Sequence, residues 1–193
     1  LIEERVYAIS AAVAVEVGKN RMEAIGEVQE TADLIDWYAD RMEEADGFDR
    51  PLADDPLPNF KSHNRSVLRP YGVWAVIAPF NFPFALAGGP LGPALIAGNT
   101  AVVKCSPETS LSGWLLLECL RDAGLPPGVI NFVTGGDTTG RALAQHPDVA
   151  GITFPGSHPV GLQVLRARSA GRSPQPFNPE LGRTHAPIRS RHG

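Results

Sequence analysis

The chain has 193 residues, of which 43% are hydrophobic, 20% charged and 7% aromatic. This length and composition suit one globular domain, or one domain with an appendage, and exclude a collagen, a disulfide-stapled mini-protein and a wholly disordered chain. The formal net charge of −4 divides unevenly, because residues 1–55 carry 15 acidic and 5 basic side chains while residues 56–193 carry 6 acidic and 12 basic ones. The mild positive excess in the second part favours an anionic small molecule and predicts no nucleic-acid partner.

Residues 1–46 are expected to form helices. Val6, Ile9, Val13 and Val17 recur at helical spacing, and a second apolar series follows Gly18, formed by Met22, Ile25, Ile35 and Met42. The acidic residues on the other face of this second helix are interpreted as solvated. From Gly47 to Pro58 the composition becomes that of a linker, which predicts a boundary.

Beyond the linker, four short apolar or β-branched runs alternate with helix-compatible stretches, at residues 73–77, 100–104, 129–133 and 151–154. Pro83 and Ser110 are expected to mark helix starts, and Gly98 and Gly124 helix ends. This alternation predicts an α/β fold, with a parallel sheet covered by helices on both faces. Ligands of such sheets bind beyond the carboxyl ends of the strands.

The cysteines and one long uncharged segment bear on the location of the protein. Cys105 and Cys119 form no C-x-x-C pair, which predicts a reducing compartment such as the cytoplasm and no zinc site. No basic-then-apolar signal opens the chain. The 34 residues from Pro70 to Val103 carry no charge, but prolines interrupt them, so a buried strand, turn and helix are expected rather than a membrane span.

Two of the predicted strand ends carry glycines or a serine that suit a phosphate group or a plain turn. Gly135 and Gly140 follow the strand at 129–133, in a loop without the G-x-G-x-x-G spacing or a Walker lysine, so they either admit a ligand or serve the turn. Ser157 follows the strand at 151–154, where it either adds a hydroxyl to a pyrophosphate at a helix N-terminus or caps that helix.

The other two strand ends carry Lys104 and Asn81. Lys104 either binds ribose hydroxyls or a phosphate, or extends to water without a function. Its neighbour Cys105 is interpreted as a packed thiol, since no partner His is evident. Asn81 lies between two aromatic residues and two prolines, and its amide either donates to an oxyanion in a sheltered cleft or ties down the turn.

Together these residues resemble the NAD(P)-dependent aldehyde dehydrogenase superfamily, in order and in spacing. The resemblance covers residues 1–182 and is carried by five blocks, Pro79–Pro83, Gly98–Lys104, Gly124–Asn131, Ile152–Gly161 and Glu180–Gly182. Within the superfamily it is nearest to the semialdehyde and 1-pyrroline-5-carboxylate dehydrogenases. It implies a Rossmann-like sheet and an enzyme in which a Cys thiolate attacks an aldehyde, NAD or NADP takes a hydride, and water releases a carboxylic acid.

The resemblance also implies roles for single residues. Asn81 would steady the oxyanion and Glu180 would be the general base, so these two are the expected catalytic residues. Lys104 would contact the adenosine ribose. The residues expected to bind NAD or NADP are Ile77, Pro79, Phe80, Lys104, Ser106, Pro107, Gly135, Gly140, Phe154, Gly156, Ser157 and Val160. No metal is expected.

The implied organisation has four parts: helices at 1–46, a linker with a strand of the kind that joins subunits at 47–72, the NAD(P)-binding domain at 73–182, and a divergent tail at 183–193. That strand makes a homo-oligomer an expectation. Three residues depart from the family pattern. Pro107 stands where a ribose-binding Glu is usual, which leaves NAD versus NADP open, Pro155 replaces a Thr, and Arg183 replaces a Gly.

Neither cysteine matches the position of the family's nucleophile. The catalytic Cys domain is therefore expected to be absent from these residues, and the isolated chain to be inactive. Two alternatives remain: a non-catalytic nucleotide-binding module, and an assembly piece that pairs with a full-length subunit. A nucleic-acid or membrane patch is disfavoured, because its arginines are scattered over residues 166, 168, 172, 183, 189 and 191 without interleaved aromatics apart from Phe177.

Overall fold

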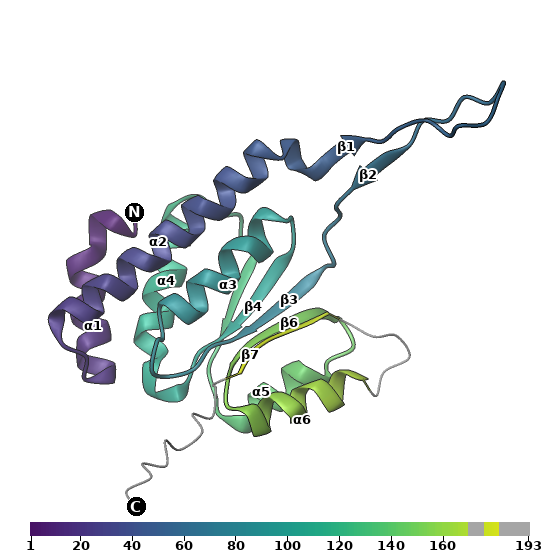
Figure 1. Cartoon of the computed structure of the whole chain (residues 1–193). Helices are drawn as coiled ribbons and strands as arrows, with labels where there is room; N and C mark the ends of the chain where they lie inside the picture. Colours follow the sequence, from purple (N-terminus) through teal and green to yellow (C-terminus); the bar gives the residue numbers. More distant parts are fainter. Residues whose placement is uncertain (170–175, 182–193) are drawn as a thin grey trace, which may run out of the picture.

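A five-stranded parallel sheet forms the centre of the molecule, in the order β5-β4-β3-β6-β7 (Figure 1). The structure, a computed structural model, describes residues 1–169 and 176–181. The strands are β3 (Val73–Ile77), β4 (Thr100–Lys104), β5 (Ile130–Val133), β6 (Val149–Gly156) and β7 (Phe177–Leu181). Every neighbouring pair in this sheet is parallel. The predicted α/β fold is therefore confirmed.

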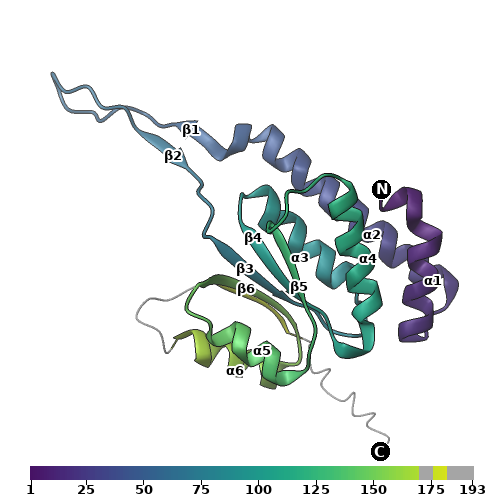
Figure 2. The ribbon, with the colours of Figure 1, turned by 180° about the vertical axis from the view of Figure 1, so that it is seen from behind.

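Helices cover both faces of the sheet. On one face lie α3 (Ala85–Ile96) and α4 (Ser110–Asp122), and on the other α5 (Asp137–Gln145) and α6 (His158–Ser169), as Figures 1 and 2 show. The N-terminal α1 (Val6–Val17) and α2 (Arg21–Glu44) form a further layer outside α3 and α4. Short 3-10 turns occur at Glu3–Arg5, Asp46–Phe48 and Pro107–Thr109. Among the described helices, none combines the length and the apolar character that crossing a membrane requires.

Alternation along the strands builds a core on each side of the sheet. In β3, Val76 joins the cluster under α3 and α4, with Val103 and Leu116, while Ile77 joins the cluster under α5 and α6, with Ile152. Burying each such side chain stabilises the fold by about 1.5–3 kcal/mol. Two-sided burial explains why the strands read as continuous apolar runs.

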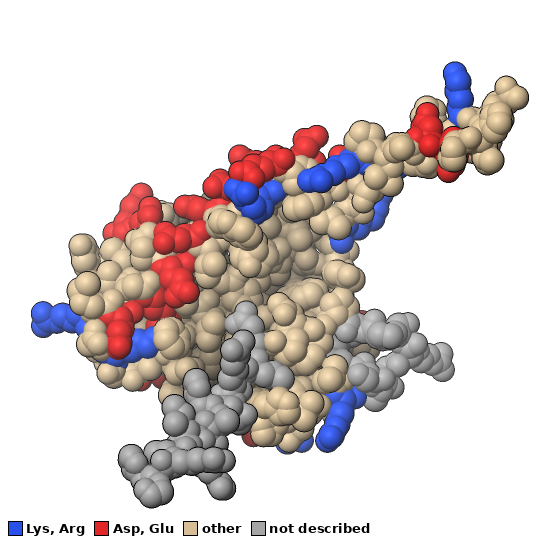
Figure 3. Space-filling model, viewed as in Figure 1, with Lys and Arg blue, Asp and Glu red and all other residues tan. Residues whose placement is uncertain are grey.

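The structure corrects the expected buried face of α2. Met22 is 76% exposed, and the buried residues of the helix are Ala24, Glu27, Val28, Thr31 and Ala32. Many acidic side chains do gather on the outer surface over α1 and α2, as Figure 3 shows. Glu27, however, is only 2% exposed, so interpreting the acidic face as uniformly solvated was wrong. A tertiary contact described below explains its burial.

Two expected helix starts also need correction. Ser110 does not cap α4; it is the first residue of that helix, and its Oγ donates to the carbonyl oxygen of Pro107 at 3.2 Å. Pro83 lies before α3, which begins at Ala85. Gly98 and Gly124 follow the ends of α3 and α4 with φ of 84° and 92°, as expected for helix-ending glycines.

The linker between the helices and the sheet forms a projecting ribbon. Within it, β1 (Asp49–Pro51) pairs antiparallel with β2 (Arg65–Val67), and the segment between them extends away from the sheet (Figure 1). A bidentate contact from Arg65 to the Asp49 carboxylate joins the two strands. The apolar side chains of Leu57 and Phe60 are more than half exposed. The predicted tail at 183–193 lies outside the described residues.

Candidate functional site

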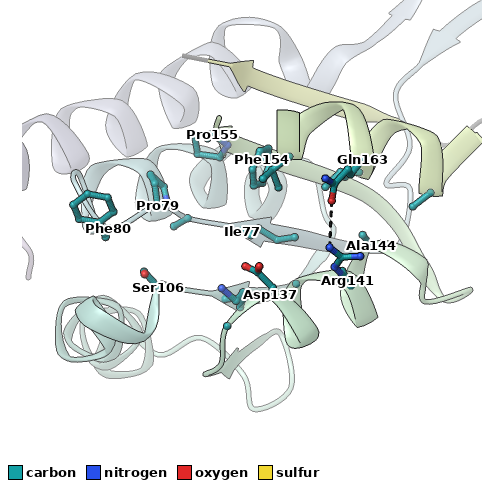
Figure 4. Close-up of a pocket in the computed structure, with 18 of the residues that line it drawn as sticks. Ile77, Pro79, Phe80, Ser106, Asp137, Arg141, Ala144, Phe154, Pro155 and Gln163 are labelled. Atoms are coloured by element: carbon teal, nitrogen blue, oxygen red, sulfur yellow. Dashed lines mark hydrogen bonds between the residues drawn. The ribbon is translucent and has the colours of Figure 1, made fainter. Parts of the chain in front are cut away.

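A cavity of about 290 Å³ opens at the carboxyl edge of the sheet (Figure 4). Its walls come from the ends of β3, β4 and β6 and from helices α5 and α6. Because parallel strands present their carboxyl ends at one edge, residues far apart in sequence meet here. The site therefore lies where the strand alternation predicts it.

Most of the residues expected to bind a cofactor line this cavity. Nine of the twelve do so: Ile77, Pro79, Phe80, Lys104, Ser106, Gly140, Phe154, Gly156 and Val160. The other three, Pro107, Gly135 and Ser157, are neighbours of lining residues but do not line it. The expected catalytic residue Asn81 does not line the cavity either.

Sequence reasoning found only Gly140 and Val160 on the helical walls and missed the other residues there. Asp137, Arg141 and Gln163 supply polar groups, and the Arg141 guanidinium donates to Oε1 of Gln163 at 3.4 Å, which joins α5 to α6 (Figure 4). The missed apolar wall comprises Ala144, Val164 and Ala167. Helical spacing could have found them, since Gly140 and Ala144, like Val160 and Val164, are four residues apart.

Lys104 is a buried cation at the end of β4. It is 7% exposed, and its ammonium makes no hydrogen bond or ion pair with the residues that the structure describes. Burial lowers the pKa of Lys104, while Cys105 and the carboxylates of Asp137 and Glu108 partly oppose that shift. Its register partner is Val133 of β5, three residues before Gly136 of the cavity wall. The ammonium thus has donor capacity available for a ligand.

The end of β6 needs glycine at position 156. A Cβ there would lie 2.4 Å from Cζ of Phe154, so only a residue without a side chain lets this strand end approach the ring. Next to it, the carbonyl oxygen of Ser157 accepts from the N–H of Gly161 at 2.9 Å, which places Ser157 at the start of α6. No hydrogen bond of its hydroxyl caps the helix within the described part of the chain. The Ser157 side chain is exposed.

The N-termini of the four helices around the sheet differ in what they meet. The Glu27 carboxylate accepts from the first N–H groups of α3, and the Glu16 carboxylate accepts from Leu111 and Ser112 of α4 at 2.9 and 2.8 Å. Helix α5 begins with Asp137. The first turn of α6 carries no acidic residue. A helix N-terminus attracts anions, so α6 is the most favourable of the four for a phosphate group.

Asn81 lies in the turn between β3 and α3. It is exposed, and its side chain makes no hydrogen bond within residues 1–169 and 176–181. The amide therefore does not tie down the turn, which disfavours the structural alternative. The backbone of Glu180 pairs with Pro155 near the carboxyl end of β7. The backbones of both residues thus lie at the edge of the sheet where the cavity opens.

Neither thiol has the environment of a nucleophile. Cys105 is 1% exposed, and burial raises the pKa of its thiol to about 12. Its Sγ packs so closely on α4 that a Cβ at Gly113 would lie 2.3 Å away. Burial also raises the pKa of Cys119. Both cysteines are packing residues, as the sequence indicated for Cys105.

Comparisons with known proteins agree on one family. A family model described as "Aldehyde dehydrogenase family" matches residues 1–188. The chain is 37% identical over 179 residues to 1-pyrroline-5-carboxylate dehydrogenase of Staphylococcus epidermidis, which covers 92% of this chain and 34% of that protein. It is 38% identical over 171 residues to alpha-ketoglutaric semialdehyde dehydrogenase of Bacillus subtilis, which covers 88% and 34%. The chain thus spans about a third of the length of these curated relatives.

Solved structures agree with the sequence comparisons. The NADP-dependent glyceraldehyde-3-phosphate dehydrogenase of Bacillus halodurans, solved in complex with NADP, superposes with a TM-score of 0.82 at 37% identity and covers 94% of this chain and 37% of that one. A bifunctional proline utilization A protein superposes with a TM-score of 0.86 at 33% identity and covers 94% and 18%.

Proposed function

Because the chain belongs to the aldehyde dehydrogenase family, we propose that it supplies the NAD(P)-binding part of an enzyme that oxidises an aldehyde or semialdehyde to a carboxylic acid. One observation supports this most: a largely buried lysine, Lys104, lines the cavity at the carboxyl edge of the sheet, and its ammonium has no ion-pair partner among the described residues. An adenosine ribose offers hydroxyls that such a donor binds. The oxygens of a phosphate group can accept hydrogen bonds from the same ammonium.

The remaining groups of the cavity fit the same cofactor. Ala144, Val164 and Ala167 give α5 and α6 apolar surfaces that suit an adenine ring, and the N-terminus of α6 beside Ser157 suits the pyrophosphate. When bound, NAD or NADP supplies the acceptor for the hydride. The Bacillus subtilis relative is named for a semialdehyde substrate, which supports the substrate class, and the Bacillus halodurans structure holds NADP, which supports the cofactor.

In the proposed reaction the chain contributes two catalytic residues. The Asn81 amide, which has no partner among the described residues, donates to the oxyanion that forms when the carbonyl is attacked. Glu180 takes the proton of the water that releases the acid. The attacking thiolate is not supplied by Cys105 or Cys119, because both are buried with raised pKa values. We therefore propose that the isolated chain does not turn over aldehydes.

A second candidate function is assembly without catalysis. The ribbon of β1 and β2 exposes apolar side chains beyond the body of the protein, which favours contact with another subunit, such as a second copy of the chain.

We also propose a reducing compartment such as the cytoplasm, since both thiols are free.

Calorimetry with NAD and NADP tests the main proposal. Saturable binding supports it, whereas the absence of saturable heat at millimolar cofactor contradicts it. Turnover of short aldehydes, measured before and after treatment with an alkylating reagent, tests the proposed inactivity. Clear turnover by the purified chain would show that proposal to be wrong.

A further inference from the structure

Two charged side chains of the N-terminal helical layer are buried beneath the turn that carries Asn81. Lys19 lies between α1 and α2, and Glu27 lies on α2. The side chains are 10% and 0% exposed, and the Lys19 ammonium pairs directly with Oε2 of Glu27. A buried ion pair by itself is weak support for stability, because desolvation offsets the attraction. The burial of the Lys19–Glu27 pair is explained by the further contacts that its two side chains make.

The Glu27 carboxylate completes the start of α3. Its Oε1 accepts from the N–H of Phe84 at 2.8 Å and from the N–H of Ala85 at 3.2 Å. Phe84 occupies the N-cap position, where its apolar side chain offers no acceptor to the first turn. Glu27 supplies that acceptor from another helix, with a negative charge at the positive end of α3.

Lys19 reaches the residue next to Asn81. Its Nζ lies 3.3 Å from the centroid of the Phe82 ring, so one ammonium contacts both the Glu27 carboxylate and this aromatic face. Phe82 is otherwise 42% exposed. The pair consequently holds the Phe82 side chain, directly after Asn81, and the backbone of Phe84 and Ala85, at the end of the turn.

The other side of the turn is fixed by the sheet. The N–H of Ala78 donates to the carbonyl oxygen of Lys104 at 2.9 Å. Between these two anchors, the side chain of Asn81 forms no hydrogen bond with any described residue. The direction of its amide therefore depends on how the ends of the turn are held.

Close packing prevents α2 from shifting relative to α3. Thr31 lies one turn beyond Glu27, and a Cβ at Gly88 would lie 2.3 Å from Cγ2 of Thr31. The two helices approach as closely as a glycine allows, which holds Glu27 under the first turn of α3. Because α2 and α3 are packed rigidly, the pair of Lys19 and Glu27 holds the turn in a fixed position relative to α2.

Resting on the function proposed above for Asn81, we propose that Glu27 and Lys19 are positioning residues, which hold the turn so that the Asn81 amide faces the reacting carbonyl. Glu16 makes a matched contact elsewhere, because its carboxylate caps α4 instead. Substitution at Glu16 therefore loosens a helix start of the same kind without touching the Asn81 turn.

Nuclear magnetic resonance of the 193-residue chain tests the proposal. The main variant is the double substitution K19M/E27Q, which removes both charges and leaves no unpaired buried ion. Amide hydrogen exchange at Phe84 and Ala85 is expected to accelerate roughly tenfold or more, since both amides lose a charged acceptor. The side-chain amide resonance of Asn81 should shift. Exchange at Leu111 and Ser112 should stay as in the wild type, and E16Q should show the reverse pattern.

The variant K19R provides the rescue, because a guanidinium keeps both the pairing and the stacking on Phe82. It should restore the wild-type exchange and the wild-type Asn81 resonance. The proposal is overturned if the Asn81 resonance and the exchange at Phe84 and Ala85 do not change in K19M/E27Q. It is also overturned if exchange accelerates equally at the starts of α3 and α4, which would mean general destabilisation. Cofactor calorimetry of the wild type is independent, so its failure would contradict the proposed function and leave this result standing.

Discussion

Replacing Lys104 by Met should weaken NAD(P) binding without weakening the fold. Lys104 is 7% exposed and its ammonium has no ion pair among the described residues, so in the free protein its charge is an unfavourable feature. Met is also unbranched, and its apolar side chain replaces the aliphatic part of the lysine. The fold should therefore be as stable as the wild type or more stable. If Lys104 binds a ligand, K104M should be as stable as the wild type or more stable. If Lys104 has a structural role, K104M should be less stable.

The size of the binding loss follows from the charge of the donor. Hydrogen bonds to charged groups contribute about 1.5–3 kcal/mol, which corresponds to a dissociation constant roughly 10- to 150-fold weaker for K104M. Calorimetry with NAD and NADP measures it. Lys61→Met is the matched control, because Lys61 is exposed on the projecting ribbon. Its affinity should equal that of the wild type.

The pH dependence of stability gives a second check on K104M. Burial lowers the pKa of Lys104 below its ordinary value of 10.5, so between the folded pKa and 10.5 the unfolded chain binds more protons than the folded one. The free energy of unfolding of the wild type should therefore gain from this group as the pH rises through that window. K104M should lack the gain in urea titrations. Wild-type affinity in K104M, or lost affinity together with an equal loss of stability, would contradict a ligand-binding role for Lys104.

Three further predictions concern the thiols, the packing of α4 and cofactor choice. At pH 8 Cys105 should be alkylated about a thousandfold more slowly in the native chain than in urea, because burial raises the pKa of its thiol from 9.0 to about 12. Fast alkylation of the native chain would contradict the burial of Cys105. Gly113→Ala should lower the free energy of unfolding by about 1–3 kcal/mol, because the new Cβ would overpack the core. The control Gly26→Ala, with nothing within 4 Å of its new Cβ, should leave the free energy of unfolding unchanged or raise it. Equal effects of the two substitutions would contradict the close packing at Gly113. Asp137→Asn should strengthen NADP binding more than NAD binding, because it removes a carboxylate near Lys104 that repels a 2′-phosphate, and an unchanged NADP-to-NAD ratio in calorimetry would place the phosphate elsewhere.

The sheet could be predicted because its strands carry their signal locally. The bounds of β3 and β4 match the predicted runs at 73–77 and 100–104, where β-branched residues lie between turn residues. The end of β6 was harder to predict from the sequence. Gly156 continues that strand through its pairing with Leu181, and this partner is remote in the sequence.

The acidic residues of the N-terminal layer show what local patterns miss. Glu27 has the spacing of a solvated residue, yet it is buried because α3, which begins 58 residues later in the chain, needs an acceptor for its first N–H groups. Glu16 serves α4 in the same way. Most of the cavity wall on α5 and α6, apart from Gly140 and Val160, was missed for a related reason, since a turn motif marks where a helix starts but not which of its faces meets the ligand.

The most direct test of the central claim is a titration of the isotope-labelled chain with NAD, followed by backbone amide resonances. We expect the shifts to be concentrated at the segments that line or adjoin the cavity, which are residues 77–80, 104–106, 136–141, 154–157 and 160–167. Shifts confined to the outer layer of α1 and α2 or to the ribbon of β1 and β2, or no shifts at saturating NAD, would contradict it.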